Sequence, residues 1–403
     1  MNLPSRRPHA ALRAIAPSLA RVGANLTLVV PGDAPLPIGR RPERARVVFR
    51  SEAALAPLAR RDHLGLAEAY LAGDIEIEGD VLEVMKITDV IRPDPSPFAK
   101  AAFALQLVLR NRTHWNRKSI AFHYDRPPEF FLPWFERWRS YSHGFYQSPD
   151  DAPADAQARK LQFAIDALAL KPGDVVFDMG CGWGSFLEYA GLQGIRVHGI
   201  TISREQYGFV RDLIHDERFP CSVELVDFQD YRPRRRFAGA VFMGTLEHYS
   251  DYRRAARFLA AHLEPDARIY ADFCTTRETH QVGAFLARYI WPGTATYVDV
   301  PRLLRELMGA GFHVHTLEDD TRSYALTVRD WADAFDRVAD DLAAVHGATQ
   351  VRAFRLFLRA SQYFLSRSKT QAYHLVAGRT PATIRPAATA ARHEKANRSP
   401  TRP

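Results

Sequence analysis

The residues whose types and spacing are best suited to chemistry form a glycine-rich loop near the middle of the chain. Residues 175–184 read VVFDMGCGWG and lead from an apolar, strand-like segment into a helix expected to begin near Ser185. Asp178 stands at the end of the strand, where its carboxylate can hold the loop and a ligand ammonium group. The glycines that let the backbone turn sharply and approach a ligand closely are Gly180, Gly182 and Gly184.

Two kinds of ligand are compatible with such a loop. A dinucleotide site needs the spacing G-x-G-x-x-G and an acidic residue at the end of the next strand, but residue 185 is serine and Thr201 stands at that strand end. An acidic residue followed by G-x-G-x-G instead resembles motif I of the class I S-adenosylmethionine-dependent methyltransferases. A glycine-rich turn without a ligand is the remaining interpretation, and the surrounding strand, loop and helix pattern disfavours it.

The segments that must position this loop alternate between strand-like and helix-like patterns. From about residue 156 the strand-like segments are DVVFDM, RVHGITI, VELVDF, GAVFMG, RIYADF and HVHTLED. This rhythm predicts an α/β domain over residues 121–376 with a mostly parallel sheet and helices on both faces. The resemblance of the loop to motif I implies that this domain has the Rossmann-like class I methyltransferase fold. Residues 24–92 show short alternating runs and one helical stretch, typical of a small N-terminal α+β domain. Prolines then begin a linker with an apolar helix over 93–120.

The net positive charge lies in the two ends of the chain. The 403 residues include 54 Lys and Arg against 46 Asp and Glu, a formal net charge of +8. A basic N-terminal segment (1–23) has four arginines and no acid up to residue 21, and a basic tail (377–403), expected to be disordered, has six basic residues and one glutamate. The nearly neutral remainder argues against a nucleic-acid partner, but composition alone does not choose between an anionic membrane surface and an acidic small substrate.

The cysteine count and the hydropathy pattern predict the compartment. Three cysteines cannot form a disulfide framework in so long a chain, and no CxxC pair suggests a zinc site. No apolar stretch approaches the ~18 residues of a membrane span. We therefore expect a cytoplasmic protein without a metal, associated peripherally with the inner face of the membrane.

Several blocks of the sequence resemble one enzyme family. GCGWG followed by GITISREQ (199–206) is similar to the cyclopropane-fatty-acyl-phospholipid synthases, a family that includes the mycolic acid cyclopropane synthases. Further blocks resemble the family in the same order: HYDRPPEFF (123–131), SYSHGFY (140–146), GTLEHYSDY (244–252) and YIWPG (289–293). The segment LGLAEAYLAGDIEIEGD (64–80) resembles the N-terminal domain of its full-length members.

The resemblance implies a reaction and a set of cofactor contacts. The methyl group of S-adenosylmethionine would pass to the double bond of an unsaturated acyl chain in a phospholipid, forming a cyclopropane ring. Gln206 would bind the ribose and Phe228 would flank the adenine, a core aromatic being the alternative for Phe228. The implied cofactor residues are Tyr141, Ser142, Gly180, Gly182, Thr201, Gln206, Phe228 and Gln229.

A dense group of aromatic side chains precedes the glycine-rich loop. Ten of the 45 aromatic residues fall between positions 122 and 146. Aromatic faces can shield and stabilise the cation left by methyl addition to an alkene, and they can line a tunnel for an acyl chain. A plain core position is the alternative for Trp134, Phe135 and Trp138.

Ring closure also requires loss of a proton, and here the chain departs from the family. The resemblance implies a bound bicarbonate as base, held in part by a glutamate and a tyrosine that match Glu247 and Tyr324. Three further positions differ: His143 replaces a cysteine, Asp272 a histidine and Cys274 an isoleucine. The Asp272 carboxylate would repel bicarbonate unless a proton or cation intervenes. His143 could supply that charge, or His143 and Asp272 could form a base pair in place of the anion.

Other outcomes remain open. If the family's base is lost, the cation would resolve differently, giving a methyl-branched or methylenated chain. A methyltransferase for a soluble amine or natural product is a further alternative, and the family resemblance is also compatible with a homodimer.

Overall fold

The computed structural model describes residues 7–91, 125–249, 251–276, 283–291 and 297–381, which divide into two compact units. The first unit contains the described residues up to 91 together with 283–290 and 336–363, and the second contains the rest. The sequence places 283–290 and 336–363 in the methyltransferase domain, whereas the structure groups them with the N-terminal residues. The predicted linker and helix (93–120) and most of the predicted tail lie outside the described residues.

The first unit is built on a small mixed sheet. Its strands lie in the order β2 (Leu36–Ile38), β1 (Leu26–Val29), β3 (Ala45–Phe49) and β4 (Ile75–Gly79). β1 and β3 are parallel, and the other two pairs are antiparallel. The helices from this part of the chain are α1 (Arg7–Arg21), η1 (Glu52–Leu55), α2 (Ala56–Ala59), α3 (His63–Ala72), α4 (Val81–Met85) and α5 (Ile87–Val90). This is the small α+β architecture that the alternating runs predict.

Helix α1 attaches the basic N-terminal residues to this unit. Leu12 and Leu19 are buried, and α1 packs against α2 and α5, while Arg13 and Arg21 are exposed. Two leucines seven residues apart lie on one helical face, which explains the packing. Arg13 and Arg21 are therefore presented on a packed helix rather than on a separate segment.

The later part of the first unit comes from three helices: η4 (Leu286–Ile290), α14 (Thr321–His346) and α15 (Ala348–Ser366). Arg352 on α15 donates to the carbonyl of Tyr70 at 3.0 Å and to Glu76 Oε1 at 2.6 Å. Tyr363 donates its hydroxyl proton to Asp89 Oδ2 at 2.5 Å. These contacts join residues nearly 300 positions apart, which explains why the sequence did not reveal the grouping.

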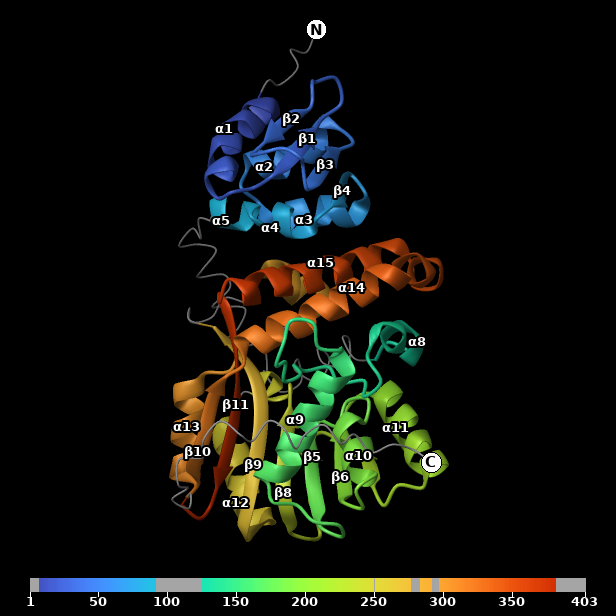
Figure 1. Cartoon of the computed structure of the whole chain (residues 1–403), viewed down its shortest axis with the longest axis vertical. Helices are drawn as coiled ribbons and strands as arrows, with labels where there is room; N and C mark the ends of the chain where they lie inside the picture. The colour runs from blue at the N-terminus through green and yellow to red at the C-terminus, as the bar shows by residue number, and fades with distance from the viewer. Residues whose placement is uncertain (1–6, 92–124, 250, 277–282, 292–296, 382–403) are drawn as a thin grey trace. The chain divides into compact units, whose positions relative to one another are not determined.

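The second unit is built on a seven-stranded sheet (Figure 1). The order is β10 (His313–Asp319), β11 (Thr370–Gly378), β9 (Leu263–Thr276), β8 (Phe237–Met243), β5 (Val175–Met179), β6 (Arg196–Thr201) and β7 (Ser222–Leu225). β5 to β9 are mutually parallel, and β11 runs antiparallel between β9 and β10. β11 extends through Ala377 and Gly378, which the sequence assigned to the disordered tail. The predicted mostly parallel α/β sheet is confirmed.

Helices cover both faces of this sheet (Figure 1). One hydrophobic core gathers Val176 of β5 with buried residues of α9 and α10, and the other gathers Phe177 with residues of α12 and α13. Successive residues of a strand point to opposite faces, so a strand buried on both sides is apolar throughout. The helices of this unit, besides the start of α14, are α8 (Pro128–Phe131), η2 (Leu132–Trp134), α9 (Pro153–Ala167), α10 (Ser185–Gly191), α11 (Arg204–Glu217), η3 (Leu246–His248), α12 (Tyr252–His262) and α13 (Val300–Gly309).

The sheet topology determines where a ligand can bind. β5 is flanked by β6 on one side and by β8 on the other, so the chain reverses its winding direction at β5. The carboxyl ends of these parallel strands, at Met179, Thr201 and Met243, meet at one edge. A crevice at such a switch point is the usual ligand site of an open α/β sheet.

Candidate active site

The loop between β5 and α10 has the backbone conformation that its glycines permit. Gly180 has φ +107°, and a Cβ there would lie 2.6 Å from Thr245 Cγ2. Gly182 has φ +54°, and a Cβ there would meet no atom within 4 Å among the described residues. Gly184, with φ +80°, is the N-cap of α10. Gly180 is thus required by close packing, whereas Gly182 leaves open space beside the loop.

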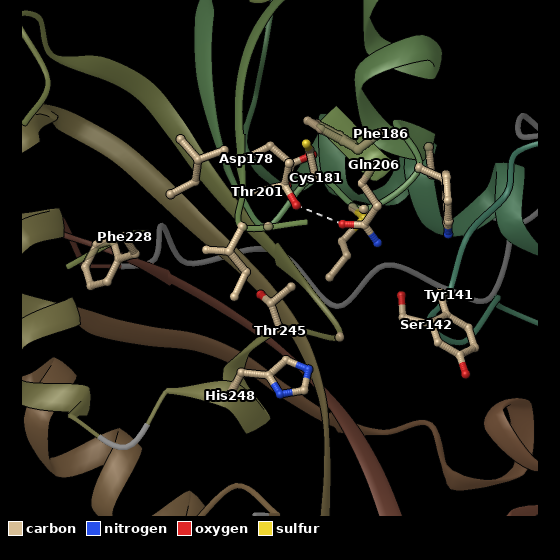
Figure 2. A pocket seen from close by; sticks show the side chains of 18 of the residues that line it. Tyr141, Ser142, Asp178, Cys181, Phe186, Thr201, Gln206, Phe228, Thr245 and His248 are labelled. Atoms are coloured by element: carbon tan, nitrogen blue, oxygen red, sulfur yellow. Dashed lines mark hydrogen bonds between the residues drawn. The ribbon is translucent and has the colours of Figure 1, made fainter. Parts of the chain in front are cut away.

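A cavity lies at the carboxyl edge of β5, β6 and β8 (Figure 2). In that view, Phe228 lies on one side of the cavity and Tyr141 and Ser142 lie on the other. Every predicted cofactor residue except Gly184 lines it: Tyr141, Ser142, Asp178, Gly180, Gly182, Thr201, Gln206, Phe228 and Gln229. The sequence did not single out other lining residues, among them Arg139, Thr245, His248 and Tyr249. The last three belong to the GTLEHYSDY block, where they could have been found.

Gln206 is held in a defined orientation (Figure 2). Thr201 donates its hydroxyl proton to Gln206 Oε1 at 2.8 Å. Ser203 caps α11 by accepting from the backbone N–H of Gln206 at 3.2 Å. Because Oε1 is engaged, the amide NH2 of Gln206 can donate to a ribose hydroxyl.

Asp178 gives the cavity a titratable carboxyl group. Its side chain is 2% exposed, and burial raises its pKa to about 7, with Lys160 lowering it and Asp272 raising it further. A ligand ammonium group beside Asp178 would stabilise the ionised form. The open space at Gly182, the oriented Gln206 and this carboxylate fit the polar groups of S-adenosylmethionine.

Phe228 has a core position and also borders the cavity, so its contact with the adenine stays a prediction. It is buried, and its ring packs edge-on against Tyr249 at 5.3 Å and Phe258 at 4.8 Å between centroids. It belongs to the core cluster on one face of the sheet and also lines the cavity.

The aromatic residues before the loop divide into core positions and a partly exposed wall. Trp134 is buried, and its indole N–H donates to the Phe130 carbonyl at 2.7 Å. Trp138 is buried in the other core cluster. Phe135 and Tyr141 are half-buried, with ring centroids 5.4 Å apart. Tyr141 lines the cavity, and the ring of Trp331 of α14 packs behind it at 5.2 Å between centroids.

A buried polar cluster lies behind the Ser142 side of the cavity. Lys160 of α9 and Asp272 of β9 are both 0% exposed, with Nζ 3.7 Å from Oδ2. Lys160 donates to Ser142 Oγ at 2.7 Å, and Ser142 donates to Asp272 Oδ2 at 3.3 Å. Tyr270 donates to the same oxygen at 3.4 Å. The cation that the sequence required beside Asp272 is therefore Lys160, which sequence reasoning missed.

His143 pairs with a different carboxylate from the one the sequence suggested. His143 Nε2 lies 3.0 Å from Asp320 Oδ2, and His374 Nδ1 lies 2.7 Å from the same oxygen. Burial would raise the pKa of Asp320, but the hydrogen bonds from both histidines outweigh it and lower the pKa to about 2. The suggested pairing of His143 with Asp272 is not formed. The Nε2 atom of His143 instead contacts Asp320, the residue that directly follows β10.

The remaining predicted catalytic residues gather beside this cluster. Glu247 Oε1 accepts from the backbone N–H of Cys274 at 2.7 Å. Burial raises the pKa of Glu247 to about 7, and the negative charge of Asp272 adds to the increase. The hydrogen bond from Cys274 lowers the pKa but does not offset the burial. The ring of Tyr324 packs on His143 at 5.1 Å and on Trp331 at 6.1 Å between centroids. The five predicted catalytic residues do not line the cavity itself, but Glu247 lies between its lining residues Thr245 and His248 in sequence.

The described residues also bear on metal sites and membrane spans. Among the residues that the structure describes, no cluster of three or more His, Cys, Asp or Glu side chains could hold a metal ion. No helix within the described ranges is both long enough and apolar enough to cross a membrane.

The sequence is similar to known lipid methyltransferases and cyclopropane synthases. The sequence model of the mycolic acid cyclopropane synthetase family matches residues 111–375. A probable fatty acid methyltransferase of Mycobacterium tuberculosis is 27% identical over 352 residues, covering 78% of this chain and 82% of that protein. Sphingolipid C9-methyltransferase 1 of Gibberella zeae is 25% identical over 358 residues, covering 83% of this chain and 69% of that protein.

The fold has solved neighbours as well. A mycolic acid cyclopropane synthase, solved with S-adenosylhomocysteine and CTAB, superposes with a TM-score of 0.61 at 21% identity. The superposition covers 65% of this chain and 98% of that chain. At this identity the likeness establishes the class I methyltransferase fold.

Proposed function

The chain belongs to the mycolic acid cyclopropane synthetase family and is an S-adenosylmethionine-dependent methyltransferase that acts on lipids, and from this premise we propose that its substrate is an unsaturated acyl chain in a phospholipid. Bound S-adenosylmethionine supplies an electrophilic methyl group, which the double bond of the acyl chain accepts. We propose that the product is a cyclopropane acyl chain, as the family resemblance implies.

The observation that carries this proposal is the buried titratable cluster beside an aromatic-walled cavity. An alkene is a weak nucleophile, so the site must act mainly by holding the reacting groups close together and in line. Methyl addition leaves positive charge on the acyl chain, and the half-buried rings of Phe135 and Tyr141 can stabilise that charge without reacting with it. Formation of any neutral product then requires loss of one proton.

We assign proton removal to His143. The Asp320 carboxylate accepts a hydrogen bond from the Nε2–H of His143, which leaves Nδ1 as the basic nitrogen. Nδ1 is buried and has no hydrogen-bond partner among the described residues. Glu247, Tyr324, Asp272 and Cys274 complete the proposed catalytic group. Replacing His143 by Gln or Asp320 by Asn should lower S-adenosylhomocysteine release about 100-fold, whereas the same His-to-Gln change at exposed His313 should not.

The same arrangement argues against a bicarbonate base. The charge of Lys160 is already matched by Asp272, so Lys160 has no unpaired positive charge left to hold an added anion. We therefore expect equal rates in carbon dioxide-depleted buffer and in the same buffer with added bicarbonate. A loss of rate that bicarbonate restores would contradict a protein base.

A second product is favoured by specific residues. His143, Asp272 and Cys274 replace the residue types that the family resemblance implies for proton removal during ring closure. Two relatives are also named as methyltransferases rather than as cyclopropane synthases. C-methylation without ring closure is therefore the second candidate.

The decisive assay combines purified protein, S-adenosylmethionine and vesicles of an unsaturated phospholipid. We expect release of S-adenosylhomocysteine and a lipid that gains the mass of one CH2 group. A cyclopropane and a methylenated chain have equal mass, so NMR must identify the product. Turnover with a soluble amine but none with lipid would refute the proposal.

We further propose peripheral membrane association through the basic ends. Arg13 and Arg21 are exposed on α1 and can contact anionic headgroups. Vesicle co-sedimentation should weaken as salt rises and when residues 382–403 are removed. Binding independent of both would contradict this step.

A further inference from the structure

Lys160 is a buried cation that the proposed chemistry does not use. Its side chain is 0% exposed, in the middle of α9. A lysine in such a position is stabilised only when its charge is paired and its protons are donated to acceptors. Burial lowers its pKa, and the nearby carboxylates of Asp272 and Glu136 oppose that change.

The contacts of Lys160 converge on one residue of the cavity wall. Lys160 donates to Ser142 Oγ at 2.7 Å, and Gln157 donates through Nε2 to the Ser142 carbonyl at 2.7 Å. Gln157 and Lys160 are three positions apart on α9, so both lie on the same helical face. One face of α9 therefore holds both the side chain and the backbone of Ser142.

Ser142 has little freedom to move without changing the cavity. It lines the cavity beside Tyr141, and a Cβ added to Gly244 would lie 3.0 Å from Ser142 Cβ. Gly244 follows β8 and lines the same cavity. A shift of Ser142 would therefore displace the wall on the side where Tyr141 lies.

We propose that Lys160 is a positioning residue of this methyltransferase: it fixes Ser142 at the wall of the cofactor cavity while neutralising Asp272 behind it. The two tasks are separable, because the first depends on the ammonium donating to a hydroxyl and the second depends on its charge. The proposal rests on the S-adenosylmethionine dependence of the protein and not on the identity of the acyl substrate.

The test separates these two tasks with a compensated variant. Lys160→Met removes both the donor and the charge, and it leaves Asp272 buried without its cation. The double variant Lys160→Met with Asp272→Leu removes the uncompensated charge and supplies no donor to Ser142, because a leucine side chain has no N–H or O–H group. Lys171→Met, at an exposed lysine, is the matched control. The two measurements are the melting temperature and the affinity for S-adenosylhomocysteine by calorimetry, neither of which needs an acyl substrate.

We expect Lys160→Met to lower the melting temperature by about 5–10 °C and the double variant to recover most of that loss. S-adenosylhomocysteine affinity should stay about tenfold weaker in both variants, because a displaced wall is not repaired by removing a charge. Ser142→Ala should weaken affinity similarly and add little to the double variant. Wild-type affinity in the double variant would show that Lys160 only neutralises Asp272, and it would overturn the positioning role. An unchanged melting temperature in Lys160→Met would overturn the neutralising role.

Discussion

The carboxyl group of Asp178 should make cofactor binding depend on pH. Its pKa is raised to about 7 by burial, so in the ligand-free protein it is protonated over much of the mildly acidic range. A ligand ammonium group interacts favourably with the ionised form only. Protons therefore compete with the ligand, and affinity must fall as the pH decreases through about 7.

The size of the effect follows from that pKa. If only the ionised form binds, the apparent dissociation constant rises by the reciprocal of the ionised fraction. This factor is about 1.1 at about pH 8 and about 11 at about pH 6, so affinity should differ roughly tenfold. Asp178→Asn should remove most of this dependence and should weaken binding at about pH 8 by roughly tenfold or more, because a charge-assisted contact is lost.

Titration calorimetry with S-adenosylhomocysteine at several pH values measures this directly. Asp166→Asn is the matched control, since Asp166 is an exposed acid on α9. Glu247 also has its pKa raised to about 7, so a small residual slope in Asp178→Asn would report Glu247. An unchanged tenfold dependence in Asp178→Asn would refute the assignment of this titration to Asp178.

The same carboxyl group affects stability with a defined sign. An acid whose pKa is higher in the folded state than in the unfolded state binds more protons when folded. The ligand-free protein should therefore lose stability as the pH rises from about 4 to about 7, by this contribution alone. Melting temperatures of the wild type and Asp178→Asn across that range should converge at the acidic end.

Two further substitutions test the packing of the cavity. Gly180→Ala should weaken S-adenosylhomocysteine binding more than tenfold, as measured by calorimetry. The added Cβ would lie 2.6 Å from Thr245 Cγ2, at a residue with positive φ. Gly208→Ala is the control and should bind normally, because no described atom lies within 4 Å of its added Cβ. Glu188→Gln should lower the free energy of unfolding in urea by about 1–3 kcal/mol, because buried Glu188 pairs with Arg139 of the cavity wall. Unchanged stability would show that Arg139 is held by other contacts.

The parts of the site that are local in sequence could be predicted from it. The loop after β5 needs its strand, its glycines and its helix within about ten residues, and apolar periodicity identifies the strand segments. Thr201 and Gln206 are five positions apart, so one block contains both. Each of these features depends on short-range backbone geometry that residue type restricts strongly.

The contacts of the charged cluster could not be predicted in the same way. His143 and Asp320 are 177 positions apart, and their pairing depends on how β10 and β11 extend the sheet. Lys160 is part of an ordinary amphipathic pattern, in which a lysine usually faces solvent. Its burial results from the packing of α9 against β9 and against the residues around Ser142, which are distant contacts that the local pattern does not indicate.

The position of β11 in the sheet has a consequence for the order in which the protein can acquire its site. In the antiparallel pairing of β11 with β9, His374 lies directly opposite Asp272. β11 is also the last strand to leave the ribosome, after every other strand of this sheet. The nascent chain can form the glycine-rich loop and the cofactor cavity early, but Asp320 receives its second histidine only when β11 inserts beside β9. Cofactor binding could therefore begin during synthesis, whereas the proposed proton-removing group would be completed last.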